Sequence, residues 1–185
     1  GGAFGAWDAT ENLQLLADAR IGWQQTSYGG SAETGASFEY EGAFTAMQAG
    51  ALYTLGGSWT AGAKLRWTHI QGDGMTDNLG ESVYISGSDS LLGTVGLSYT
   101  AQNLAFGHFM PLARAELLHE FNGRGISRVE GHRLGELSLR GTSGRLTLGL
   151  NYTDEVRGLS ATLAGFAQGG QEDGWGLKLN GNLRF

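Results

Sequence analysis

Apolar and polar residues alternate along much of the chain, and the clearest case is the stretch from Trp175 to Phe185. Successive side chains of a β-strand point to opposite faces, so the pattern places Trp175, Leu177 and Phe185 on one face. Lys178 and Arg184 then lie on the opposite face. A half-buried strand of a soluble sheet would show the same alternation. An aromatic residue at a strand end, however, is typical of the girdle where a transmembrane barrel meets the membrane surface.

Seven further segments share this period of two, so the chain is predicted to be an all-β, antiparallel domain over residues 1–185. The eight predicted strands lie near residues 13–28, 36–55, 58–70, 90–101, 108–121, 145–153, 158–168 and 174–185. In the second segment the alternation changes phase near Ala46 and Met47, which predicts a β-bulge there. Polar and glycine-rich segments separate the strands, and long linkers are expected over residues 71–90 and 122–140.

Composition narrows the class of protein. The 185 residues include 33 glycines, one proline and no cysteine, so the chain has the length of one domain and neither a disulfide nor a thiolate metal site. Only 16% of the residues are charged, against about 25% in typical soluble domains. No stretch approaches the roughly 20 consecutive apolar residues of a membrane-spanning helix. The net charge of −6 argues against nucleic acid as a partner.

The charged residues on the predicted polar faces are interspersed with Gly, Ser, Thr and Asn. This pattern favours the lumen of a barrel over the solvated face of a soluble sandwich, because basic and acidic groups can pair across a lumen. The residues predicted to face the lumen are Arg20, Lys64, Arg66, Arg114, Glu116, Glu120, Arg145 and Arg184.

Aromatic residues recur near the ends of the predicted apolar faces. Trp59 and Trp67 are separated by eight residue steps, about 26 Å at the rise of a strand, which is close to the height of the apolar band of an outer-membrane barrel. The residues predicted to lie at the membrane interfaces are Trp23, Trp59, Trp67, Tyr99, Phe121, Tyr152 and Trp175.

The sequence gives little support for an enzyme or a cofactor site. The four histidines lack the spacing of metal ligands, and the glycine-rich turns lack the Gly-Lys-Ser/Thr of a phosphate loop. Glu116 and Glu120 could do acid-base chemistry, but structural ion pairs with basic residues such as Arg114 are the favoured interpretation. We therefore expect no enzyme activity and no cofactor.

Several segments, in their order along the chain, resemble the translocator, or β-domain, of the autotransporter family of Gram-negative bacteria. They are residues 65–69, 73–80, 92–99, 111–121, 146–152 and the last strand, and they extend over about the last two thirds of the chain. The most specific of them begins at Pro111 and ends in His119, Glu120 and Phe121. The resemblance implies a twelve-stranded outer-membrane barrel, of which this chain would hold the C-terminal eight strands.

The resemblance also implies type V secretion, in which the barrel enables an N-terminal passenger of the same protein to reach the cell surface. The implied partners are outer-membrane lipid, the barrel-assembly machinery during insertion, and the passenger itself. The last strand resembles the signal that this machinery recognises, with Lys178, Leu183 and Phe185 in three of its positions. Asn180 stands where glycine is usual.

One alternative is a complete, small eight-stranded outer-membrane barrel that acts as an adhesin, an anchor or a lipid-modifying enzyme. Side chains fill the interior of an eight-stranded barrel, so such a barrel could not pass a polypeptide. Pairing of the first predicted strand, which begins at Leu13, with the last strand would favour this alternative.

Overall fold

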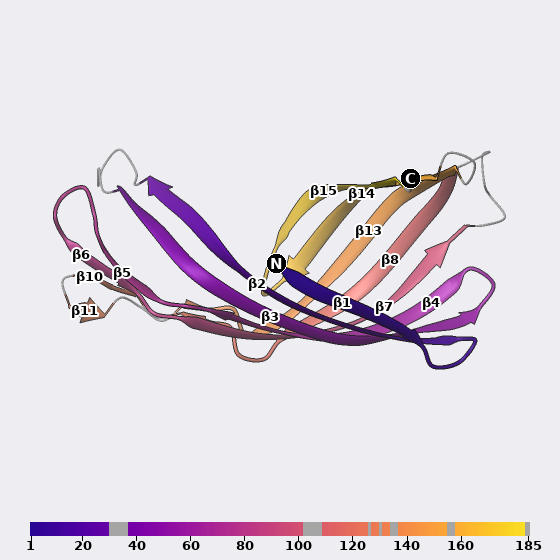
Figure 1. The fold of residues 1–185 in the computed structure, drawn as a ribbon, viewed down its shortest axis with the longest axis horizontal. Helices are drawn as coiled ribbons and strands as arrows, with labels where there is room; N and C mark the ends of the chain where they lie inside the picture. Colours follow the sequence, from indigo (N-terminus) through magenta and orange to yellow (C-terminus); the bar gives the residue numbers. More distant parts are fainter. Residues whose placement is uncertain are drawn as a thin grey trace.

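The computed structural model describes residues 1–29, 37–101, 109–125, 127–129, 131–133, 137–154 and 158–183. Its main feature is an eleven-stranded sheet that curls into a trough (Figure 1). Nine strands follow one another in space, each antiparallel to the next: β1 (Gly2–Asp8), β2 (Leu13–Gly29), β3 (Ser37–Gly56), β4 (Trp59–Ile70), β7 (Ser88–Thr100), β8 (Phe109–Glu120), β13 (Gly141–Asp154), β14 (Leu159–Gly170) and β15 (Gly174–Leu183). Within the described ranges, no helix is long and apolar enough to cross a membrane.

The all-β antiparallel fold predicted from the sequence is confirmed, but the nine-stranded path contains one strand more than the eight that were predicted. The eight predicted strands correspond to all members of the nine-stranded path except β1, which pairs with β2 from Gly2 opposite Arg20 to Asp8 opposite Gln14. The segment was missed because small residues occupy most of it and hide the alternation. The strand that begins at Leu13 is therefore not the edge of the sheet. The two edges are β1 and β15.

The bulge predicted at Ala46 and Met47 is absent from the described strands. The registers of β3 with β2 and with β4 run through this point without a shift, and the irregularity lies instead between Thr54 and Gly56. Ala46 is a small apolar residue that lies on the polar face of β3. It therefore interrupts the alternation of apolar and polar residues in the sequence without shifting the strand register. The turn after β3 needs glycine, because Gly56 and Gly57 have φ angles of 102° and 59°.

The two predicted linkers contain short strands of their own. A second, four-stranded sheet, here called the loop sheet, combines both linkers in the order β11-β10-β6-β5. Its strands are β5 (Asp73–Thr76), β6 (Ser82–Ile85), β10 (Ser127–Val129) and β11 (His132–Arg133). Two further short strands, β9 (Arg124–Gly125) and β12 (Leu137–Ser138), pair with each other, and β9 also pairs with β7. The predicted long linkers thus contain six short strands, which the sequence did not indicate.

The two faces of the main sheet differ in polarity. On one face Trp59 lies opposite Tyr99 and Ala63 lies opposite Val95, which continues the apolar pattern from strand to strand. The opposite face carries the polar residues. Apart from Asp154, which ends β13 on the apolar side, the buried side chains of the main sheet lie on the polar face. These are Thr94, Leu118, Glu120, Ser143 and Ala164. The polar face is therefore the concave, more crowded side of the trough, and the apolar face is the convex side.

The connections differ between the two ends of the strands. At one end, here called the turn end, β1 joins β2 through residues 9–12 and β3 joins β4 through residues 57–58. At the other, here called the loop end, the linkers over residues 71–87 and 121–140 carry the four strands of the loop sheet, which lies on the left of Figure 1. Short turns at one end and long loops at the other are typical of outer-membrane barrels.

Candidate functional site

Aromatic side chains form two rims on the convex face, one at each end of the strands. At the turn end, Trp59 packs against Tyr99 with ring centroids 4.9 Å apart, and Phe109 packs against Tyr152 at 5.1 Å. The residues of the loop-end rim are Trp23, Trp67, Phe121 and Trp175. Six of the seven aromatic residues predicted to be interfacial lie near strand ends, whereas Trp23 lies six residues before the end of β2. Their interfacial role stays a prediction. Trp7, Tyr53 and Phe109 extend the turn-end rim and were missed, because only the strand register shows their position.

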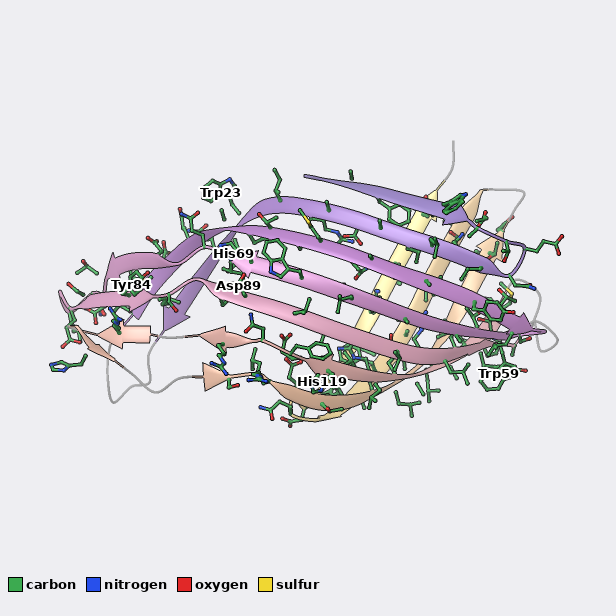
Figure 2. The ribbon with its side chains drawn as sticks, turned by 90° about the horizontal axis from the view of Figure 1, so that it is seen from below. Trp23, Trp59, His69, Tyr84, Asp89 and His119 are labelled. Atoms are coloured by element: carbon green, nitrogen blue, oxygen red, sulfur yellow. The ribbon has the colours of Figure 1, made fainter. Side chains whose placement is uncertain are left out.

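Polar partners accompany the rings at the loop end (Figure 2). His69 Nδ1 lies 2.9 Å from Asp89 Oδ1, and the His69 ring stacks near Trp67 with centroids 6.1 Å apart. His119 Nδ1 lies 2.8 Å from Thr142 Oγ1. Amphipathic groups of this kind suit an interface between an apolar and an aqueous phase.

Between the two rims, the convex face is aliphatic and uncovered. Leu148 is 58% exposed, Leu163 54% and Leu177 76%. Other exposed aliphatic residues of the same band are Leu65, Val95, Leu117, Leu146 and Leu179. Soluble monomers seldom expose a contiguous apolar patch of more than a few hundred Å². This band therefore requires an apolar environment outside the chain.

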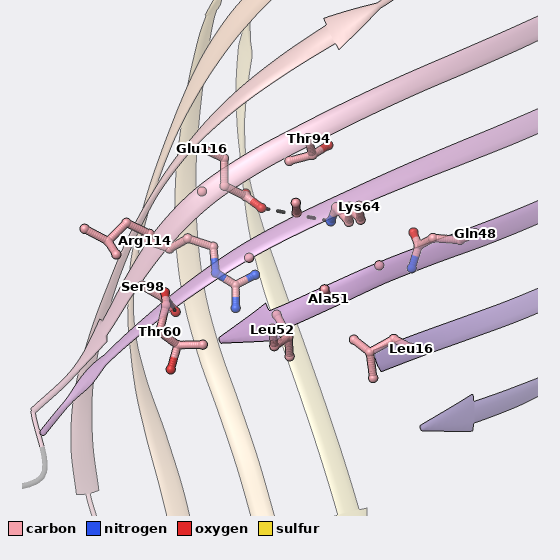
Figure 3. Close-up of a pocket in the computed structure, with 15 residues that line it drawn as sticks. Leu16, Gln48, Ala51, Leu52, Thr60, Lys64, Thr94, Ser98, Arg114 and Glu116 are labelled. Atoms are coloured by element: carbon pink, nitrogen blue, oxygen red, sulfur yellow. Dashed lines mark hydrogen bonds and ion pairs between the residues drawn. The ribbon is translucent and has the colours of Figure 1, made fainter. Parts of the chain in front are cut away.

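The concave face gathers the charged residues that the sequence singled out. By strand register, Arg20, Lys64, Arg66, Arg114, Glu116, Glu120 and Arg145 all lie on it. Arg184 lies outside the described residues. The Nζ of Lys64 lies 4.0 Å from Oε1 of Glu116, which links β4 to β8 across β7 (Figure 3).

A chain of polar contacts crosses β2, β3 and β4. Oε1 of Gln48 accepts hydrogen bonds from Nε and Nη2 of Arg66, at 3.1 and 2.9 Å. Gln48 Nε2 in turn donates to Asp18 Oδ2 at 3.1 Å, and Asp18 Oδ1 lies 3.0 Å from Nε of Arg20. Gln48 thus joins two arginines on strands that are not neighbours. Sequence reasoning missed Gln48 and Asp18, because only the register brings them beside the arginines.

Arg145 is held in a similar way on β13. Its Nε donates to Gln168 Oε1 at 2.8 Å, and its guanidinium carbon lies 5.3 Å from the centroid of the Phe166 ring. Gln168 Nε2 donates to Glu172 Oε2 at 3.1 Å. The direct partners of Arg145 in these contacts are neutral, so its position is fixed while its charge is not cancelled.

Glu120 departs from the predicted ion pair with a basic residue. Its described partners are the Ser90 hydroxyl, at 2.6 Å from Oε2, and the backbone N–H groups of Leu91, Asn122 and Gly123. The three N–H groups donate to Oε1 at 2.8, 3.0 and 2.9 Å. Glu120 therefore ties the end of β8 to β7 and to the linker that follows.

A hollow of about 90 Å³ lies in the concave wall (Figure 3). Lys64, Thr94, Ser98, Arg114 and Glu116 line part of it. Thr94 is 5% exposed, and its Oγ1 has no hydrogen-bond partner in the structure. Among the described residues, no three His, Asp or Glu side chains gather as metal ligands.

The three residues of the predicted assembly signal are only partly described. Lys178 lies on the concave face of β15 beside Ala164, and the backbone of Leu183 pairs with Leu159. Phe185 lies outside the described residues. The signal role of these residues stays a prediction.

A family model, that of the autotransporter beta-domain, matches residues 1–165. The chain belongs to the autotransporter β-domain family. The family is one of outer-membrane translocator barrels, and the predicted resemblance is thereby confirmed. The match also covers residues 1–64, which precede the segments that suggested the resemblance. A comparison with curated proteins gives no match.

Proposed function

We propose that this autotransporter β-domain lies in the outer membrane of a Gram-negative bacterium, where it anchors an N-terminal passenger and enables its secretion. The observation that carries the proposal is the exposed aliphatic band of the convex face, bounded at both ends by aromatic rims. Lipid would cover this band, as it covers the outer wall of transmembrane barrels. The polar concave face would then line the lumen. We assign no catalytic step and no cofactor to the domain.

The edges of the sheet bear on how the barrel closes. In the described part of the chain, β1 and β15 each pair with one neighbour and not with each other. Unpaired backbone N–H and C=O groups in lipid cost several kcal/mol each. We propose that further strands or the barrel-assembly machinery pair with these edges in the membrane. The alternative of a small, closed eight-stranded barrel is not favoured, because the main path has nine strands and remains open.

The proposal can be tested in cells with the full-length protein, tagged near the N-terminus of its passenger. We expect it in the outer-membrane fraction, with a folded band whose gel mobility changes on heating. Protease added to intact cells should remove the tag. A folded outer-membrane barrel whose tag stays protected would overturn secretion of the upstream segment. Recovery of the protein in the soluble fraction would overturn the whole proposal.

Two internal tags provide matched controls for orientation. Gly80 lies in an exposed turn of the loop sheet, with φ of 87°, and Gly57 lies in the turn between β3 and β4. Long loops of outer-membrane barrels face the outside and short turns face the periplasm. A tag at Gly80 should therefore be cleaved on intact cells, whereas a tag at Gly57 should be cleaved only after the outer membrane is opened. The reverse result would contradict the proposed orientation.

A further inference from the structure

The concave face is rich in basic residues although the whole chain is acidic. The chain has 12 Lys and Arg against 18 Asp and Glu. On the concave face of the nine-stranded path, as far as it is described, the basic residues are Arg20, Lys64, Arg66, Arg114, Arg145 and Lys178. The acidic residues of the same face are Asp8, Asp18, Glu116 and Glu120. Half of all basic residues thus share one face.

The acidic residues of this face leave much of the positive charge uncancelled. Asp18 is paired with Arg20, and Glu120 is bound by backbone N–H groups and the Ser90 hydroxyl. Arg66 and Arg145 donate to the neutral oxygens of Gln48 and Gln168. For Arg114, the described contacts provide no acceptor.

The uncancelled charges lie together at mid-height of the wall. Glu116 is directly opposite Arg145 on β13, and on its other side it faces Gly96 of β7. Lys64 and Arg66 lie on the concave face of β4, and Arg114 and Glu116 lie on that of β8, with Lys64 Nζ 4.0 Å from Glu116 Oε1. A concave wall with charge of one sign concentrates counter-ions, because low-dielectric surroundings focus the field.

We propose that the barrel conducts small inorganic anions in preference to cations, and that Lys64, Arg66, Arg114 and Arg145 set this preference. The inference rests on the proposed function, because it requires the concave face to line an aqueous path across the membrane. Lysine and arginine side chains around a pore select anions by attracting them and repelling cations. The glutamines that hold Arg66 and Arg145 fix these charges in place without neutralising them.

The test is the reversal potential of the purified, full-length protein in planar lipid bilayers across a KCl gradient. We expect chloride permeability to exceed potassium permeability several-fold. The ratio should rise as the salt is diluted, because the Debye length grows from about 3 Å at 1 M to about 30 Å at 0.01 M. A ratio at or below one would overturn the inference.

The two proposals can fail separately. A protein that folds into a heat-modifiable barrel but carries no current overturns the anion preference and leaves the translocator standing. A protein that does not insert into membranes overturns the proposed function and the inference with it.

Substitutions of Lys64 and Glu116 distinguish an effect of charge on the permeability ratio from structural damage caused by breaking their ion pair. Lys64→Gln and Arg114→Gln should each lower the permeability ratio toward one, whereas Glu116→Gln should raise it several-fold. Damage caused by breaking the ion pair would instead shift the ratio in the same direction for Lys64→Gln and Glu116→Gln, and would contradict the inference. Arg140→Gln, an exposed substitution outside the strands, is the control and should leave the ratio unchanged.

Discussion

Phe166 lies across Gly176 of the neighbouring strand, so close that a Cβ on Gly176 would come within 2.7 Å of the ring carbon Cε1. Phe44 and Gly22 stand in the same relation on β3 and β2, again at 2.7 Å. In both pairs the absence of a side chain on glycine leaves room for the ring on the concave face. The rings thereby cover backbone that glycine would otherwise leave bare.

Gly176→Ala should destabilise the domain. The new Cβ displaces the Phe166 ring, over which the Arg145 guanidinium rests at 5.3 Å. We expect a loss of about 1–3 kcal/mol in the free energy of unfolding, as for other overpacked sites, measured by urea unfolding in detergent micelles. Gly181→Ala on the same strand is the control, because no heavy atom lies within 4 Å of the added Cβ. Equal losses for both variants would contradict the role of the ring.

Glu120→Ala should loosen the junction between β7, β8 and the following linker. The substitution leaves the N–H groups of Leu91, Asn122 and Gly123 without their acceptor, at a cost of about 1–3 kcal/mol for each buried group left unsatisfied. Glu120→Gln keeps one oxygen for these groups and should lose less stability in the same urea experiment. If the two variants are equally unstable, the negative charge matters and the hydrogen-bond set does not.

The fold was largely predictable because a membrane barrel imposes one rule along every strand. Lipid contacts one side of the wall, so an apolar residue recurs at every second position, and β4 shows this from Trp59 to Trp67 without interruption. The rule fails where glycine and alanine fill both faces, as in β1. It also fails in the loop sheet, which is held by pairing between two distant linkers and leaves no periodic signal.

The concave face was predictable as a set of residues but not as a set of contacts. Because every second residue of a strand points to the same side, the sequence alone assigns Arg66 and Arg145 to the polar face. Their partners depend on the register between strands, which the sequence of a single strand does not contain. Gln48 and Gln168 therefore escaped notice, and Glu120 was assigned to an ion pair although backbone N–H groups bind it.

Asp77→Ala should loosen the loop sheet without unfolding the main sheet. Asp77 is 8% exposed, and its Oδ1 accepts hydrogen bonds from the N–H groups of Leu79 and Glu81 at 2.9 and 2.8 Å. These bonds close the turn between β5 and β6. We expect faster cleavage within residues 71–87 by added protease, with an unchanged heat-modifiable band.

Asp77→Asn is the matched variant, because its amide oxygen can still accept both hydrogen bonds and should restore protection. Neighbouring Asn78 would remain docked on β3, where its Oδ1 accepts from the Ser37 N–H at 2.6 Å. Loss of the heat-modifiable band in Asp77→Ala would show that the loop sheet is required for the barrel itself, against this expectation.

Leu148→Lys tests whether lipid covers the convex face. Leu148 is 58% exposed in the middle of the aliphatic band, and Leu139 is 53% exposed at the loop end, outside the strands. In water the two substitutions would be equally harmless, because surface changes usually alter stability by less than about 0.5 kcal/mol. In a membrane, a lysine at the midplane of the lipid face costs about 2–4 kcal/mol, whereas Leu139→Lys remains in the aqueous phase. Only Leu148→Lys should therefore reduce the heat-modifiable, outer-membrane fraction. Equal tolerance of both would mean that the convex face meets water and that the barrel assignment is wrong.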